Sequence, residues 1–113
     1  MLEYSVEEVA RAVGGRLILT GAGARVRGVS TDTRTLQPGD LFFALPGERA
    51  DGHRYLGQAI AAGAAAAVVD PRRLDSLPST APPLIHVPDV RRALGDLAAY
   101  HRARHWNQIH RTA

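Results

Sequence analysis

The sequence contains no cysteine and no lysine, and each absence removes a class of chemistry. All fourteen basic residues are arginine. Without cysteine the chain has no disulfide, no thiolate metal site and no cysteine nucleophile. Without lysine it has no Schiff-base chemistry and no phosphate-binding P-loop, in which a lysine reaches the β- and γ-phosphates. We therefore expect no catalytic residue of these kinds.

Long apolar runs are also missing. No stretch approaches the ~20 apolar residues of a membrane-spanning helix, and residues 1–15 carry acids where a signal peptide carries bases. The length of 113 residues is typical of one domain. Aromatic residues make up only 5% of the chain, which favours helices packed closely over a small sheet. We expect a soluble, cytoplasmic domain.

The positive charge is confined to one end of the chain. Residues 1–88 contain nine arginines and nine acids, whereas residues 89–113 contain five arginines and two acids, so the net charge of +3 arises in the second segment. A basic segment can bind nucleic acid, but a solvated helix face or a linker has the same composition. We predict no nucleic-acid partner and no membrane partner.

The first third of the chain predicts a helix and a hairpin. Ser5 and Glu8 have the spacing of a capping box, and apolar residues at helical spacing follow until Gly14. Residues 16–20 and 25–31 resemble two strands joined by a glycine-containing turn. We expect these two strands to pair as a β-hairpin.

The rest of the chain alternates strands with helices. The predicted strands are residues 41–45, 64–70 and 84–87. The first predicted helix comprises residues 53–62 and is ended by Gly63. The second comprises residues 90–104, begins after the capping residue Asp89 and loses its helical pattern after Arg104. This alternation predicts an α/β fold with a small mixed, partly parallel sheet and helices on both faces, preceded by the N-terminal helix and β-hairpin. Ligands of such sheets bind at the carboxyl ends of the parallel strands.

The stretch "STDTRTLQPGDLFFALPGERADGH", residues 30–53, places two polar loops around one buried strand. Asp32 is suited to an Asx turn, Asp40 to capping the turn at Pro38–Gly39, and Asp51 to the N-cap of the following helix. The threonine hydroxyls, the arginines and a helix N-terminus suit a phosphorylated small molecule such as a nucleoside diphosphate.

The five histidines give no convincing metal site. Only His101 and His105 have the i, i+4 spacing, and no acid lies between them. We expect these two on a solvated helix face, and we expect His86, in an apolar strand, to be a hydrogen-bonded core residue.

Several motifs together resemble one protein family. They are the stretch of residues 30–53, "YLGQAIAAGAAAAVVD", and the flanks "SVEEVARAVGGRL" and "DVRRALGDLAAYHRARH". Over residues 3–105 the chain resembles the N-terminal domain of the Mur ligases, which are ATP-dependent enzymes that add amino acids to the peptidoglycan precursor. The "GVSTDTR" form resembles the member that adds D-alanyl-D-alanine to UDP-MurNAc-tripeptide. The member that adds the third residue, diaminopimelate or lysine, is the alternative.

The resemblance implies a binding site for the UDP moiety of the precursor. It implies that Thr31, Thr33 and Arg34 in the first loop, and Glu48, Arg49, Ala50 and His53 in the second, belong to this site. It implies no catalytic residue and no metal ligand in this chain.

The resemblance also implies parts that this sequence does not contain. In the family a central ATPase domain supplies a lysine-containing phosphate loop and the ligands for magnesium. We therefore expect residues 1–105 to form the UDP-precursor-binding domain, and residues 106–113 to be a divergent tail or a truncated linker. The chain alone is not expected to be catalytic, and the full-length ligase would need ATP and magnesium. The alternative is a stand-alone, non-catalytic nucleotide-sugar-binding or regulatory module.

Overall fold

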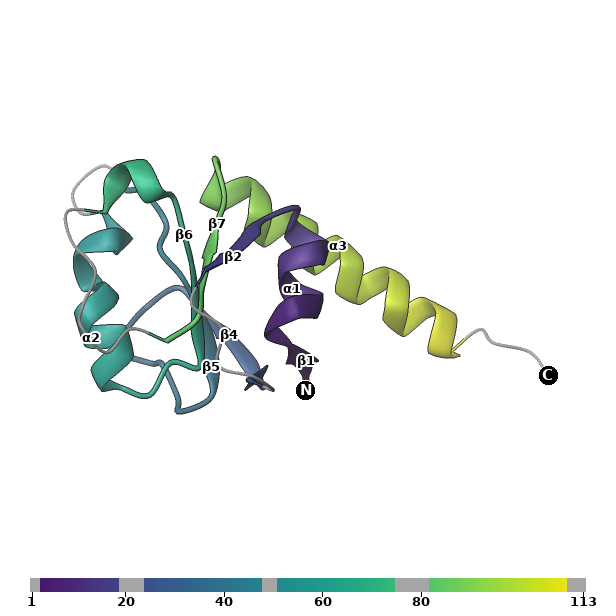
Figure 1. The fold of residues 1–113 in the computed structure, drawn as a ribbon. Coiled ribbons are helices and arrows are strands. Elements are labelled where there is room, and N and C mark those ends of the chain that lie inside the picture. The colour runs from purple at the N-terminus through teal and green to yellow at the C-terminus, as the bar shows by residue number, and fades with distance from the viewer. Residues whose placement is uncertain (1–2, 19–23, 48–50, 75–81, 110–113) are drawn as a thin grey trace.

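The computed structural model describes residues 3–18, 24–47, 51–74 and 82–109, with backbone alone for residues 106–109. The elements, in which η marks a short 3₁₀ helix, are β1 (Tyr4–Ser5), α1 (Val6–Val13), β2 (Arg16–Ile18), β3 (Arg25–Val26), β4 (Gly28–Ser30), β5 (Asp40–Phe43), η1 (Gly52–Tyr55), α2 (Leu56–Ala61), β6 (Ala66–Val69), η2 (Pro71–Arg73), β7 (Leu84–His86) and α3 (Val90–Ile109). Figure 1 shows a central sheet with helices on both of its faces.

The central sheet has five strands in the order β2-β7-β6-β5-β4. Strands β4, β5, β6 and β7 are parallel, and β2 is antiparallel to β7 at one edge. The predicted α/β class with a mixed, partly parallel sheet is therefore confirmed. Because β4 and β5 are parallel neighbours, the two polar loops that follow them leave the same edge of the sheet.

Each face of the sheet is buried under its own helices, because successive residues of a strand point to opposite faces. Leu41 and Phe43 of β5 belong to the cluster that contains residues of α1 and α3, whereas Phe42 packs with Leu56 and Ala59 of α2. In Figure 1, α2 lies on one side of the sheet, and α1 and α3 lie on the other.

The predicted hairpin does not form. β2 pairs with β7, and the second predicted strand is divided into β3, which pairs with β1 in a separate two-stranded sheet, and β4, which pairs with β5. The break falls at Arg27, whose backbone N–H donates to the carbonyl of Gly39 (2.9 Å) instead. Alternation of arginine and valine indicates which face is buried, but not which strand lies alongside.

Helix α1 begins and ends where the sequence predicts. The Ser5 hydroxyl accepts the backbone N–H of Glu8 (3.1 Å), and Gly14 closes the helix with φ of 64°. The reciprocal half of the capping box is replaced by a tertiary contact. The Glu8 carboxylate accepts hydrogen bonds from Tyr100 (2.6 Å) and Arg104 of α3.

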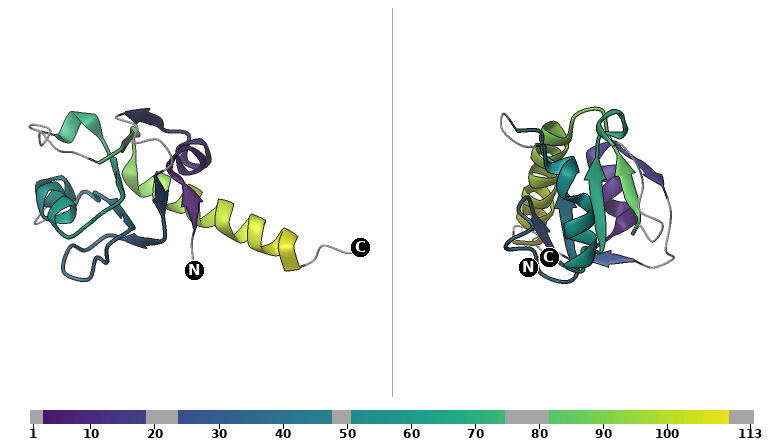
Figure 2. Two further views of the ribbon diagram at one scale, coloured as in Figure 1. Left: turned by 60° about the horizontal axis from the view of Figure 1, so that its bottom comes forward. Right: turned by 90° about the vertical axis from the view of Figure 1, so that its left-hand side faces the viewer.

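Helix α3 is longer than predicted, because its backbone remains helical as far as Ile109 instead of ending near Arg104. Its C-terminal half projects beyond the rest of the molecule (Figures 1 and 2). Val90 and Leu97 are buried, whereas Ala98 is exposed. Contacts with α1 and β1 support the projecting part, including a 2.7 Å hydrogen bond between the Tyr4 hydroxyl and Nδ1 of His101.

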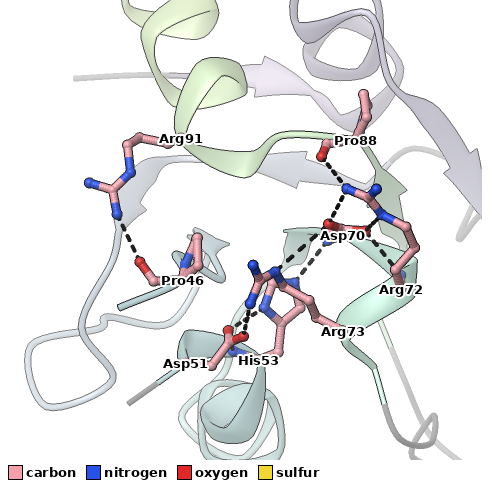
Figure 3. A network of polar contacts seen from close by, with 8 residues as sticks. All are labelled: Pro46, Asp51, His53, Asp70, Arg72, Arg73, Pro88 and Arg91. Carbon is pink, nitrogen blue, oxygen red and sulfur yellow. Dashed lines mark hydrogen bonds and ion pairs between the residues drawn. The ribbon is translucent and has the colours of Figure 1, made fainter. Parts of the chain in front are cut away.

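His53 joins the loop after β5 to the end of β6 (Figure 3). Its ring is buried, with 2% of the side chain exposed. Nε2 accepts the backbone N–H of Asp70 (2.8 Å), so the proton of the neutral ring is on Nδ1, which donates to Oδ1 of Asp51 (2.5 Å). Arg73 of η2 adds a second link to Asp51, at 2.8 Å from Oδ2.

Asp51 also caps the helix that follows, as predicted. Its Oδ1 accepts the backbone N–H of His53 (3.0 Å). Burial acts to raise the pKa of the Asp51 carboxyl, but hydrogen bonds from the backbone and ring of His53 and from Arg73 outweigh it, and the pKa is lowered to about 2. Asp51 is therefore a fixed anion at neutral pH.

Asp51→Asn keeps the capping oxygen and removes the charge, so it should reduce the free energy of unfolding at pH 7 by about 1–2 kcal/mol. A carboxyl whose pKa is lowered on folding stabilises the folded state above its ordinary pKa near 4, and this stabilisation is lost as the pH falls toward 2. Urea unfolding of both proteins between pH 6 and pH 2.5 should show the difference shrinking below pH 4. A difference that stays constant would contradict this assignment.

Gly52 lies where two backbone segments approach closely. A Cβ at this position would be 2.7 Å from the backbone nitrogen of Leu45, whereas one at Gly57 would meet open space. Gly52→Ala should reduce the free energy of unfolding by about 1–3 kcal/mol, and the control Gly57→Ala should be neutral or raise it by up to about 1 kcal/mol. Equal effects of the two substitutions on urea unfolding would show that the close approach carries no constraint.

Candidate functional site

An open cleft of about 530 Å³ lies at the carboxyl ends of β4 and β5. One wall is the loop that follows β4, and the other wall is η1 and the start of α2. The cleft is lined by Thr31, Asp32, Thr33, Arg34, Phe42, Leu45, Gly52, Tyr55 and Gln58. The two polar loops that leave the same edge of the sheet therefore meet at one concave surface.

The first wall is shaped by hydrogen bonds within the loop. The Ser30 hydroxyl donates to the carbonyl of Asp32 (2.8 Å), and Oδ1 of Asp32 accepts the backbone N–H of Arg34 (2.9 Å), which is the predicted Asx turn. The Arg34 guanidinium also donates to both carboxylate oxygens of Asp32, at 2.7 Å from Oδ2. These side-chain and backbone hydrogen bonds lower the pKa of Asp32 to about 2. Asp32 is thus not suited to proton transfer at neutral pH.

The second wall contributes two residues that the sequence analysis did not identify as site residues. The Thr33 hydroxyl donates to Oε1 of Gln58 (3.2 Å), which connects the first loop to α2. Tyr55 lines the cleft with 38% of its surface exposed. Tyr55 falls within the helix predicted for residues 53–62, but in the structure it belongs to the 3₁₀ segment η1, which precedes α2.

Of the residues that the resemblance implies, Thr31, Thr33 and Arg34 line the cleft. Glu48, Arg49 and Ala50 lie outside the described residues. His53 is buried in the polar network beside a second, smaller hollow of about 260 Å³ and is absent from the cleft lining. Asp40 lies at the other end of β5, where its carboxylate caps the turn by accepting the backbone N–H of Gln37 (2.9 Å).

The other histidines differ in their surroundings. Nε2 of His86 is buried without a hydrogen-bond partner among the described residues, so the predicted core hydrogen bond is not formed at this atom. Burial and the nearby Arg16 lower the pKa of His86. The rings of His101 and His105 stack with centroids 6.3 Å apart.

The described part of the chain contains no group of three or more histidine, aspartate or glutamate side chains arranged to hold a metal ion. None of its helices is both long enough and apolar enough to cross a membrane.

Comparison with known proteins supports one family. Residues 25–102 match the "Mur ligase family, catalytic domain". The chain is 41% identical over 97 residues to a UDP-N-acetylmuramoyl-L-alanyl-D-glutamate–2,6-diaminopimelate ligase of Parasynechococcus marenigrum, covering 84% of this chain and 19% of that protein. It is 42% identical over 95 residues to a UDP-N-acetylmuramoyl-tripeptide–D-alanyl-D-alanine ligase of Mycobacterium tuberculosis, covering 80% and 18%.

The fold supports the same family. A crystal structure of MurF from Acinetobacter baumannii superimposes with a TM-score of 0.75 at 28% sequence identity, covering 92% of this chain and 22% of that one. The chain thus spans about a fifth of the length of the relatives it matches. The sequence match over most of the chain and the shared fold confirm the expected resemblance to the N-terminal domain of these enzymes. The chain belongs to the Mur ligase family.

Proposed function

We propose that the cleft binds the UDP moiety of a UDP-MurNAc-peptide, and that this chain acts as the N-terminal recognition domain of an ATP-dependent Mur ligase. The supporting observation is the position of the cleft, which brings the two motif loops together at the carboxyl ends of β4 and β5. Its volume is in the range of about 300–1,000 Å³ that is typical of small-molecule sites.

The side chains of the cleft suit binding better than catalysis. Threonine hydroxyls and a glutamine amide can form hydrogen bonds with a base or a ribose, and the exposed ring of Tyr55 offers a flat apolar surface. The two charged residues of the lining, Asp32 and Arg34, neutralise each other. The domain would therefore hold the precursor while other parts of the ligase activate its carboxylate.

We propose that this chain holds neither ATP nor magnesium. The chain has no lysine to reach the nucleotide phosphates, and its described residues offer no cluster of metal ligands. We assign ATP and magnesium to the full-length ligase, and in particular to a central ATPase domain that would be the partner of this one.

We further propose that the ligase is the D-alanyl-D-alanine-adding one, acting on UDP-MurNAc-tripeptide in the cytoplasm. The "GVSTDTR" form of the first loop and the structural similarity to MurF support this choice. The alternative is the third-residue-adding ligase, which the 41% identity to a diaminopimelate ligase supports. A stand-alone, non-catalytic nucleotide-sugar-binding module is a second alternative, supported by the absence of lysine.

Titration of the chain with UDP-MurNAc-tripeptide, UDP and uridine, followed by backbone amide NMR shifts, tests the proposed function. All three ligands should perturb residues 31–34, Gly52 and Tyr55, because these residues line the cleft. The resemblance adds residues 47–53 to the expected shifts. Shifts confined to α3, or no saturable shift with any ligand, would refute the proposal.

Tyr55→Ala should weaken UDP binding by about 1–3 kcal/mol if the base stacks on the ring, whereas Tyr55→Phe should retain most of the affinity. Val29→Ala is the matched control, because Val29 is similarly exposed at 41% but does not line the cleft. Isothermal titration of UDP into the four proteins measures the effect. An unchanged affinity of Tyr55→Ala would remove Tyr55 from the binding surface.

A further inference from the structure

The 3₁₀ segment η1 turns one side to the cleft and another to the interior. Residues three positions apart lie above one another in a 3₁₀ helix, and Gly52 and Tyr55, which have this spacing, both line the cleft. His53 lies between them, but its ring is buried behind the cleft wall and is absent from the lining. The contacts that fix the His53 ring therefore also fix the wall that a ligand would touch.

The hydrogen bonds of the ring require its neutral form. The backbone N–H of Asp70, at the end of β6, donates to Nε2 (2.8 Å), so Nε2 must present a lone pair. Nδ1 donates to Oδ1 of Asp51 (2.5 Å). A second proton, on Nε2, would set two donors against each other in a buried place, and the link between η1 and β6 would be lost.

The charged side chains around the ring come from three elements. They are Asp51 in the loop after β5, Asp70, Arg72 and Arg73 at the end of β6 and in η2, and Asp89 at the start of α3 (Figure 3). The pKa of Asp51 is lowered to about 2, and hydrogen bonds from Arg72 lower the pKa of Asp70. Arginine remains charged at neutral pH. Histidine is the residue type of this network whose charge ordinarily changes near neutral pH.

We propose that His53 is a positioning residue of the nucleotide cleft, and that the cleft binds its ligand more weakly when Nε2 gains a proton. This inference rests on the proposed function, because it requires that a nucleotide occupy the cleft. His53 acts through Gly52 and Tyr55 and does not touch the ligand. Protonation removes the link of η1 to β6, so a smaller fraction of molecules holds the wall in the binding position.

Uridine is the probe for this coupling, because it carries no phosphate that would titrate in the same pH range. Its dissociation constant, measured from backbone amide NMR shifts, should rise by about 2- to 10-fold between pH 8 and pH 5, as expected for the loss of about one net hydrogen bond. Asp32 and Asp51 keep their charges over this range, since the pKa of each is about 2. The same spectra report whether the chain is folded, which separates weaker binding from unfolding.

His53→Gln separates the charge of the ring from its contact with Asp70. The glutamine amide oxygen can accept the backbone N–H in place of Nε2, but the amide does not titrate. The uridine affinity of this variant should therefore stay constant between pH 8 and pH 5. His86→Gln is the control, because His86 is a half-buried histidine of the same sheet that does not line the cleft. A fall in affinity that persists in His53→Gln, or that disappears in His86→Gln, would overturn the inference.

The proton on the ring can also be followed in the unmodified chain, which covers the case in which His53→Gln does not fold. Ring ¹⁵N shifts should identify Nδ1 as the protonated nitrogen at pH 8, and Nε2 should gain its proton over the pH range in which the affinity falls. Saturating uridine should move the midpoint of this protonation about 0.3–1 pH unit lower, because coupling between two equilibria is reciprocal.

The outcomes distinguish this inference from the proposed function. Uridine binding that is independent of pH, or a midpoint that uridine does not move, would overturn the inference and leave the proposed function standing. The absence of saturable uridine binding at pH 8 would also overturn it. If UDP and UDP-MurNAc-tripeptide failed to bind as well, the proposed function would fall with it.

Discussion

The neutral imidazole of His53 holds together the edge of the sheet on which the cleft is built. One ring nitrogen accepts from the backbone at the end of β6, and the other donates to Asp51 in the loop after β5. Because the ring is buried and both nitrogens are used, neither Asp51 nor the backbone of Asp70 can move away from the ring without breaking a buried hydrogen bond. Arg72 extends the network, since it donates to Asp70 and to the carbonyl of Pro88 after β7.

The geometry of the cleft follows from that edge. Asp51 caps the 3₁₀ segment whose last residue is Tyr55, and Gly52 lies against the backbone of Leu45. Helix α2 has only six residues, and a helix of this length is not stable alone. The position of Gln58 opposite Thr33 therefore depends on the buried network behind it, which includes His53 although His53 does not line the cleft.

The sequence predicted the parts of this arrangement that depend on local patterns. The three consecutive apolar residues of β5 indicated a strand buried on both faces, and Asp32 and Asp51 occupy the turn and cap positions that their spacing suggested. Strand partners were not predictable, because alternation in residues 25–31 is compatible with either neighbour. Gln58 was missed for a similar reason: its contact with Thr33 joins residues 25 positions apart, and no local pattern marks it.

Within residues 30–53, the charged side chains that the structure describes have structural partners, and this limits what the cleft can recognise. Asp32 and Arg34 form a bidentate pair, and the Asp40 carboxylate caps a turn at the far end of β5. A phosphate approaching Arg34 would have to compete with a carboxylate already bound there, since both oxygens of Asp32 accept from the same guanidinium. Hydroxyl, amide and aromatic groups remain as the accessible groups of the lining. Such a surface discriminates by hydrogen-bond polarity and shape more than by charge, which suits the uncharged base end of a nucleotide.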